Sequence, residues 1–256
     1  MNMNKNIEKE KQWLLRDKYH NKKTVGFFKD IERLEKGELI DYIIGWRPFL
    51  NCKIDLRFKP LSPRTETEFW VERVIKKMRP SFVKTTEGKI KILDLCSGSG
   101  CIGVAVLKNI KNSHVVFGEL NKTLIQQIRI NLKLNKISRE KYQIIQSNLF
   151  GNIKGKFDFI LTNPPYVALK RKNKIQKSVL EHEPHLALFG GQDGLSLIEK
   201  ILKQAPKYLN ENGQIWLEFD SFQKSAINKL LKQLKYKNWQ FFKDQFGRWR
   251  WVIIQH

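Results

Sequence analysis

The segment Asn163-Pro164-Pro165-Tyr166 combines two hydrogen-bond acceptors with a flat ring. The side-chain oxygen of Asn163 and the carbonyl of Pro164 could accept both N–H bonds of a planar amide or aromatic amine, and the prolines supply no competing N–H donor. Tyr166 adds a face on which such a group can stack. A nitrogen held in this way is aimed at an electrophile by positioning, so the segment is suited to nitrogen methylation without a strong base or a metal.

A glycine-rich turn, Gly98-Ser99-Gly100, follows an apolar run of strand length. Its glycines permit positive φ and close approach of a ligand, and the next helix offers free N–H groups. Glu119, nineteen residues after Gly100, could accept hydrogen bonds from both hydroxyls of a ribose. Nicotinamide and flavin sites share these features with S-adenosylmethionine sites. Asp94 favours S-adenosylmethionine, because a carboxylate there attracts an ammonium and a sulfonium but repels a pyrophosphate.

Residues 146–150 form a third polar segment after an apolar run. Asn148 could bond the amino edge of an adenine, and Leu149 or Phe150 could cover its ring. An ordinary loop after a strand would have a similar composition.

Apolar runs of strand length alternate with helical patterns after Gly88. The alternation predicts right-handed crossovers and a parallel sheet covered on both faces, with ligands at the carboxyl ends of the strands. A closing hairpin is expected over 239–242 and 248–254. The strands are expected at 90–95, 114–118, 142–145, 157–161 and 214–219, and the helices at 102–110, 122–135, 195–209 and 222–234.

The region before Gly88 predicts smaller elements. Residues 7–39 are charged with scattered apolar positions, which indicates two short amphipathic helices. The runs 42–46 and 52–58 predict a β-hairpin, and a helical period resumes over 65–78.

Composition sets further bounds. Lys and Arg number 48 against 25 Asp and Glu, a formal charge of +23, while 41% hydrophobic residues exclude a disordered polycation. A membrane-spanning run and a secretion signal are both missing from the sequence, so a cytoplasmic protein is expected. The cysteines Cys52, Cys96 and Cys101 have no paired spacing, which favours reduced thiols over disulfides or a metal site.

The positive charge is spread along the chain and would favour encounters with polyanions such as RNA or ribosomes. One local run, residues 170–177, holds five basic residues in eight directly after the Asn163–Tyr166 segment. This run is either a solvated loop or a contact surface.

From Asp41 onward the sequence resembles the HemK/PrmC family of protein-(glutamine-N5) methyltransferases. The Asn-Pro-Pro-Tyr segment alone is also typical of adenine-N6 methyltransferases of DNA and RNA. Two segments discriminate: Pro63–Glu68 is similar to the family's P-R-P-E-T-E, and Glu183–Leu195 is similar to its E-P-x-x-A-L-x-G-G-x-D-G-L. Leu217-Glu218 and the turn at 246–248 agree more weakly.

The resemblance implies a class I S-adenosylmethionine-dependent methyltransferase fold of α/β type, with a Rossmann-like, mostly parallel seven-stranded sheet and a C-terminal antiparallel hairpin. It implies methyl transfer from S-adenosylmethionine to the glutamine side-chain amide in the GGQ motif of peptide chain release factors. The implied catalytic residues are Asn163, Pro164, Pro165 and Tyr166. The implied cofactor-binding residues are Asp94, Cys96, Ser97, Gly98, Ser99, Gly100, Glu119, Asn148, Leu149 and Asn163.

Three positions depart from the family pattern: Thr65 replaces a proline, and Glu119 and Asn148 each replace an aspartate. Asn148 keeps an acceptor oxygen, and the longer Glu119 could still reach a ribose. The N-terminal extension is shorter than the family's helical bundle. The expected division is a helical substrate-recognition region over 1–40, a hairpin linker over 41–64 and the methyltransferase domain over 65–256.

Rival functions are methylation of an exocyclic amine such as adenine N6 in RNA or DNA, methylation of a ribosomal-protein glutamine, and non-catalytic RNA binding on this scaffold. The expected partner is a release factor, with nucleic acid or ribosome contact through the basic surface as an option. A monomer without membrane contact or a bound metal is expected.

Overall fold

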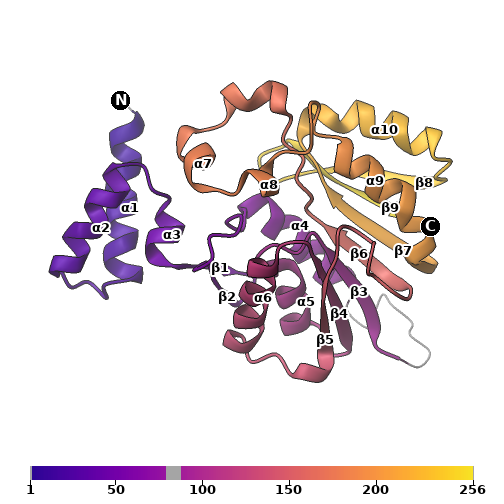
Figure 1. Cartoon of the computed structure of the whole chain (residues 1–256), viewed down its shortest axis with the longest axis horizontal. Coiled ribbons are helices and arrows are strands. Elements are labelled where there is room, and N and C mark those ends of the chain that lie inside the picture. The colour runs from indigo at the N-terminus through magenta and orange to yellow at the C-terminus, as the bar shows by residue number, and fades with distance from the viewer. Residues whose placement is uncertain (1, 79–87, 256) are drawn as a thin grey trace.

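The computed structural model describes residues 2–78 and 88–255, with side chains from residue 7 onward. Its centre is a seven-stranded sheet in the order β5-β4-β3-β6-β7-β9-β8 (Figure 1). Strands β3 to β7 are parallel, β9 is antiparallel to β7, and β8 is antiparallel to β9. The predicted α/β fold and its closing hairpin are therefore confirmed. The strands are β3 Ile90–Leu95, β4 Ser113–Glu119, β5 Tyr142–Gln146, β6 Phe157–Thr162, β7 Leu209–Glu218, β8 Asn238–Lys243 and β9 Trp249–Gln255.

Helices cover both faces of the sheet, because its central strands are apolar on both sides. On β3, Ile92 packs into the core beneath one helical layer and Leu93 into the core beneath the other. Burying both alternate faces in this way is what an apolar parallel strand requires. One layer holds α4 Thr65–Lys77, α5 Cys101–Asn109 and α6 Lys122–Leu134, and the other holds α9 Ser196–Gln204 and α10 Lys224–Gln233.

Strand β3 lies between β4 and β6. The chain continues from β3 to β4 and β5 on one side and then crosses to β6 on the other side, so the strand order reverses at β3. The strand ends are level: Leu95 at the end of β3 is paired with Gly118 on β4 and with Thr162 on β6. The loops after these strands therefore meet in the crevice where α/β sheets bind ligands.

The first three helices form a cluster beside the sheet (Figure 1). They are α1 Asn2–Asp17, α2 Val25–Glu35 and α3 Ile40–Ile44. The two expected amphipathic helices are present, but the strand expected over 42–46 is wrong. Ile43 is buried against Leu14 and Phe27 of the helices, and this tertiary contact outweighs its strand propensity. Gly45, at φ +88°, ends α3 and turns the chain into the hairpin.

The predicted hairpin is formed by β1 Trp46–Phe49 and β2 Cys52–Asp55, which is shorter than expected. It is fastened to the sheet's helical layer by carboxamides of α6 and of the residue that caps it. Asn131 Oδ1 accepts the Asp55 N–H at 2.8 Å, and Asn135 Oδ1 accepts the Lys53 N–H at 3.0 Å. The hairpin thus connects the N-terminal helices to α6. The division into regions by role stays a prediction.

Most predicted helices lie within two residues of the observed ones. The helix expected over 195–209 ends at Gln204, and β7 starts at Leu209, five residues earlier than the strand predicted from 214. All three cysteines are free thiols. In the part of the chain that the structure describes, no helix is long and apolar enough to cross a membrane. The short elements are η1 Arg139–Lys141, η2 Leu169–Lys174, α7 Lys177–His182, α8 His185–Leu188, η3 Ala205–Tyr208 and η4 Ser221–Gln223.

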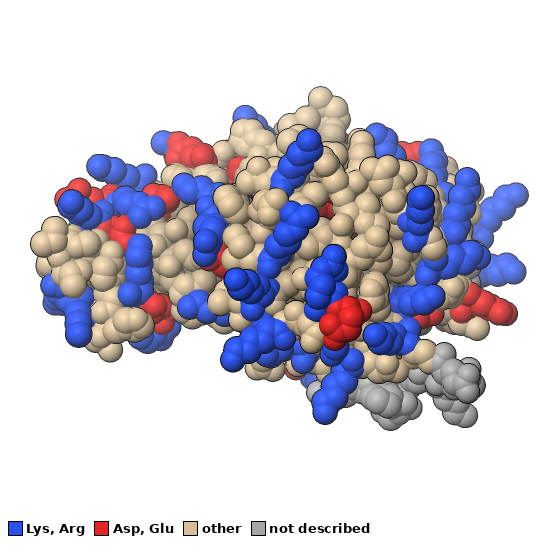
Figure 2. Space-filling view, turned by 60° about the horizontal axis from the view of Figure 1, so that its bottom comes forward, with Lys and Arg blue, Asp and Glu red and all other residues tan. Residues whose placement is uncertain are grey.

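Figure 2 shows the side of the molecule that lies at the bottom of Figure 1, near α6 and β5. This face carries many more Lys and Arg side chains than Asp and Glu. Between residues 108 and 141 the one exposed acidic side chain is Glu140. The basic side chains of this stretch form no ion pair with described residues. We call them the α6 basic surface: Lys108, Lys111, Lys122, Arg129, Lys133, Lys136, Arg139 and Lys141.

Candidate active site

A cavity of about 310 Å³ lies at the carboxyl ends of β3, β4, β5 and β6. Eight of the ten predicted cofactor-binding residues line it, and Pro165 lines it as well. The other two, Asp94 and Gly100, do not. The lining predicted residues are Cys96, Ser97, Gly98, Ser99, Glu119, Asn148, Leu149 and Asn163.

Asp94 lies behind the glycine turn and is fully buried. Its Oδ2 accepts the Gly103 N–H at 2.9 Å, while its Oδ1 has no hydrogen-bond partner among the described residues. Burial raises the pKa of Asp94 well above its usual value, and the nearby Glu119 raises it further. Asp94 therefore anchors the start of α5, and its second oxygen lies buried without a partner among the described residues.

Glu119 borders the cavity from the end of β4. Its Oε2 accepts the Gly98 N–H at 2.8 Å, and its Oε1 accepts the Asn121 N–H at 2.9 Å. Each carboxylate oxygen has a second lone pair, so both can accept one more hydrogen bond. Glu119 thus holds the glycine turn and keeps acceptor capacity toward the cavity.

The backbone turns sharply where the strands end. Cys96 has φ +60° and Leu149 has φ +50°, a left-handed conformation that is costly for residues with a Cβ atom. Gly98 adopts φ +54° without that cost. The Thr162 hydroxyl donates to the Leu95 carbonyl at 2.8 Å and so ties the ends of β3 and β6 together. Strain of this kind is typical of functional sites.

Asn163 follows β6 and borders two cavities. Its Nδ2 donates to the hydroxyl of Thr67 at 3.1 Å. Its Oδ1 and the Pro164 carbonyl receive no hydrogen bond from any described residue. The predicted pair of free acceptors is therefore present, and Thr67 holds the amide that supplies one of them.

The second cavity, of about 270 Å³, adjoins the first through shared lining residues. Pro164 and Tyr166 line this second cavity rather than the first. The basic run supplies Ile175 to its wall, and α7 supplies Val179. The residues common to both cavities are Leu61, Arg64, Asn163 and Ala187.

Tyr166 is held by its hydroxyl, which donates to Glu218 Oε1 at 2.9 Å. Burial raises the pKa of Tyr166 well above its usual value, and the negative charge of Glu218 adds to this. Burial also raises the pKa of Glu218, opposed by its hydrogen bonds from Trp70, Thr67 and Tyr166. The tyrosine is thus a fixed part of the cavity wall.

The 183–195 segment braces the Asn163–Tyr166 segment from outside. A Cβ atom on Gly194 would lie 2.0 Å from the Tyr166 carbonyl oxygen, and one on Gly190 would lie 2.4 Å from that of Pro165. Gln223 Nε2 donates to the Tyr166 carbonyl at 2.9 Å. These glycines are needed because the two backbones touch.

Glu183 holds the same segment against the loop before α4. Its side chain is fully buried and accepts hydrogen bonds from the Ser62 N–H and from Arg64. Burial raises the pKa of Glu183, and the positive charge of Arg64 opposes that rise. Pro184, Leu186 and Ala187 thereby come to line the first cavity.

Sequence reasoning missed Thr67, Glu218 and the bracing glycines as parts of the site. All of them lie in segments that carry the family resemblance, which was the available signal. Groups of three or more His, Cys, Asp or Glu side chains able to hold a metal are absent from the described ranges.

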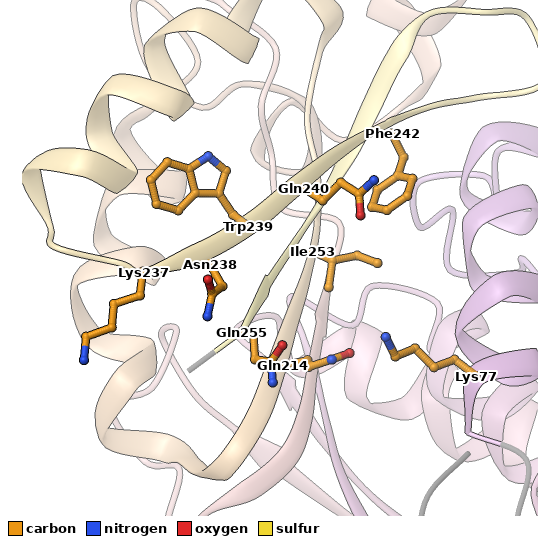
Figure 3. A pocket seen from close by; sticks show the side chains of 9 residues that line it. All are labelled: Lys77, Gln214, Lys237, Asn238, Trp239, Gln240, Phe242, Ile253 and Gln255. Carbon is orange, nitrogen blue, oxygen red and sulfur yellow. The ribbon is translucent and has the colours of Figure 1, made fainter. Parts of the chain in front are cut away.

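A third cavity, of about 470 Å³, lies on the far edge of the sheet near β8 and β9 (Figure 3). Lys77 and Lys237 border it from opposite sides, while the Trp239 ring points away toward α10. It contains no residue of the predicted site.

Comparison with known proteins identifies the family of the chain. The model of the Methyltransferase small domain matches residues 78–192. A release factor glutamine methyltransferase of Lactococcus lactis is 30% identical over 94% of this chain and 86% of its own length. That of Borreliella burgdorferi is 39% identical over 82% of this chain and 72% of its own.

A solved structure extends the comparison to the fold. The Thermus thermophilus 16S rRNA N2 G1207 methyltransferase, in complex with AdoMet and guanosine, superposes with a TM-score of 0.57 at 17% identity, covering 82% of this chain and 49% of that one. This likeness confirms the methyltransferase fold. The length and identity of the two sequence matches carry the conclusion further: the chain belongs to the family of release factor glutamine methyltransferases.

Proposed function

We propose that this enzyme transfers a methyl group from S-adenosylmethionine to the side-chain amide nitrogen of the glutamine in the GGQ motif of a peptide chain release factor. The observation that carries the proposal is the pair of free acceptors, Asn163 Oδ1 and the Pro164 carbonyl, beside two adjoining cavities. The first cavity would hold the cofactor and the second the glutamine.

The residues of the first cavity fit S-adenosylmethionine. Glu119 retains two acceptor positions for ribose hydroxyls, and the glycine turn permits close approach. Leu124 and Leu149 offer apolar walls to an adenine, and Asn148 offers a polar edge. Asp94 lies behind the turn and does not line the cavity, and a cationic ligand nearby would favour its ionised form.

The cofactor supplies an electrophilic methyl group on a sulfonium. Asn163 Oδ1 and the Pro164 carbonyl accept the two N–H bonds of the substrate amide and so aim its nitrogen at that methyl group. The same two oxygens would stabilise the positive charge that the amide nitrogen gains when it accepts the methyl group. One N–H proton then leaves to solvent, which yields the neutral methylated amide.

The wall of the second cavity matches a peptide carrying a glutamine. Val179 and Leu188 give it apolar surface, and the Arg64 guanidinium lies at the boundary of the two cavities. Arg64 is held by Glu183, so it keeps N–H groups in a fixed direction for a peptide carbonyl. Apolar walls with a polar group at the boundary fit a glutamine side chain, whose methylene groups are apolar and whose end is an amide.

Methyl transfer from labelled S-adenosylmethionine tests the function. We expect incorporation into a purified release factor, loss of incorporation when the GGQ glutamine is replaced, and none into total RNA, DNA or ribosomal proteins. Incorporation into nucleic acid that persists without protein substrate would contradict the proposal and favour the adenine alternative.

The N-terminal helices are proposed to dock the release factor. Trp13 on α1 and Phe28 on α2 are 43% and 54% exposed although their helices have a core of their own. Exposed aromatic side chains are common anchors in protein interfaces. Phe28→Ala should raise KM for the release factor without changing kcat or cofactor affinity, and an unchanged KM would contradict this role.

The α6 basic surface is proposed to attract a polyanion such as the ribosome. The enzyme is proposed to work as a monomer in the cytoplasm. The charges of this surface lack carboxylate partners among described residues, so they remain available to phosphates. Lys133→Glu together with Lys136→Glu should weaken ribosome association and reduce its salt dependence. A ribosome affinity that changes neither with these substitutions nor with salt concentration would refute this contact.

A further inference from the structure

Glu218 receives a set of hydrogen bonds from the wall of the site. It ends β7 and is fully buried. Its Oε2 accepts the Thr67 hydroxyl and the Trp70 indole N–H, both at 2.7 Å. Its Oε1 accepts the Tyr166 hydroxyl at 2.9 Å. The carboxylate therefore joins α4, β7 and the Asn163–Tyr166 segment.

The direction of these hydrogen bonds restricts Thr67. A threonine hydroxyl has one proton, and here that proton points at the Glu218 carboxylate. The oxygen of Thr67 consequently offers only lone pairs to Asn163. The Asn163 side chain must place its NH₂ group there, at 3.1 Å, which turns its Oδ1 toward the cavities.

The opposite arrangement would disable the proposed site. If Thr67 donated to Asn163 instead, the asparagine amide would turn by about 180° and present its NH₂ group to the substrate. Two donors would then face each other, and the substrate nitrogen would lose one of its two acceptors. The charge on Glu218 selects against that arrangement, because a carboxylate has no proton to give.

We propose that Thr67 and Glu218 are positioning residues that set the orientation of the Asn163 carboxamide and thereby the acceptor that binds the substrate amide. This inference rests on the proposed function. It assigns a task to two buried polar groups that would otherwise serve only to attach α4 to the sheet.

A merely structural role makes a different prediction. Trp70 donates to the same oxygen of Glu218 as Thr67, but its indole does not bond Asn163. Trp70→Phe therefore removes one hydrogen bond from the network without touching the amide. It is the matched control for any loss that arises from weaker attachment of α4.

Kinetics of the full-length enzyme distinguish the two roles. Thr67→Val and Glu218→Gln should each lower kcat about 10- to 100-fold with little change in KM for the cofactor. Thr67→Ser, which retains the hydroxyl, should keep most of the wild-type rate. Trp70→Phe should lower the free energy of unfolding but change kcat much less than Thr67→Val does. In an Asn163→Ala background, Thr67→Val should cause no further loss. A further loss of the same size would overturn the inference.

A second measurement does not depend on the substrate. In ¹⁵N-asparagine-labelled protein, the Asn163 side-chain NH₂, identified by its loss in Asn163→Ala, should show nuclear Overhauser contacts to the Thr67 methyl group. Those contacts should weaken in Glu218→Gln. If they are absent in the wild-type protein or unchanged in the variant, the positioning role fails, whatever the substrate. Failure to label a release factor, with these contacts present, would instead count against the proposed function alone.

Discussion

Replacing Glu119 by alanine probes the proposed cofactor site at one position. Glu119 is 8% exposed, and its carboxylate accepts the Gly98 N–H at 2.8 Å and the Asn121 N–H at 2.9 Å. The change removes an anchor of the glycine turn together with the proposed acceptor for the ribose hydroxyls. Cofactor affinity and folding stability should therefore both fall, but by different amounts.

The two losses can be worked from the contacts. A hydrogen bond to a charged group contributes about 1.5–3 kcal/mol, so two ribose hydroxyls correspond to at least about 3 kcal/mol, or roughly 100-fold in Kd. The two backbone N–H groups lie at the cavity edge, where water can replace the lost acceptor. We therefore expect a smaller loss of unfolding free energy, about 1 kcal/mol.

Calorimetric titration with S-adenosylmethionine and urea unfolding measure these quantities separately. Asp158 provides the control, because its Oδ2 accepts the Lys91 N–H at 2.8 Å near the opposite end of β6. Asp158→Ala should lower stability and leave cofactor affinity unchanged. The reasoning is refuted if Kd for Glu119→Ala stays within about threefold of the wild-type value, or if Asp158→Ala weakens binding equally.

Three further predictions follow from the same geometry. Gly194→Ala should destabilise the fold by more than about 2 kcal/mol in urea unfolding, because a backbone clash adds to the cost of its φ of +78°. At Gly247, with φ +77°, an added Cβ would have no atom of the described residues within 4 Å apart from its chain neighbours. Gly247→Ala should therefore cost only the conformational part of the unfolding free energy, and equal losses for the two variants would contradict the bracing role. Neutralising residues 170–172 should slow association with the release factor at low salt, and salt-independent rates would leave that run a solvated loop. The pKa of Asp94 is raised in the free protein, and a bound cation favours its ionised form. Cofactor affinity should therefore fall as the pH drops through that raised pKa. Asp94→Asn should make the affinity less dependent on pH, as measured by calorimetric titration at several pH values.

The sequence predicted those residues of the site that lie at or directly after the end of a predicted strand. Glu119 ends β4 and Asn163 directly follows β6, so the rule that ligands bind at the carboxyl ends of parallel strands was enough to bring them together. Leu186 lines the cavity but was not singled out, and the Glu183–Arg64 ion pair holds its segment against the loop before α4. That pair joins residues far apart in the chain.

The positioning network could not be predicted in the same way. Glu218 is 151 residues from Thr67, and Asn163 is 96 residues from it, so no spacing in the sequence joins them. The strand predicted over 42–46, where the structure has α3, was wrong for a similar reason. Burial of Ile43 among the N-terminal helices outweighs its local strand propensity. Tertiary contacts, rather than local pattern, decide both features.

Single-turnover methyl transfer by Asn163→Ala tests the central claim, that a carboxamide oxygen and a backbone carbonyl hold the substrate amide. With enzyme saturated by S-adenosylmethionine, the rate on the release factor should fall about 10²- to 10³-fold while the Kd of the cofactor changes little. A rate equal to that of the wild-type enzyme, or a loss explained entirely by weaker cofactor binding, would contradict the account.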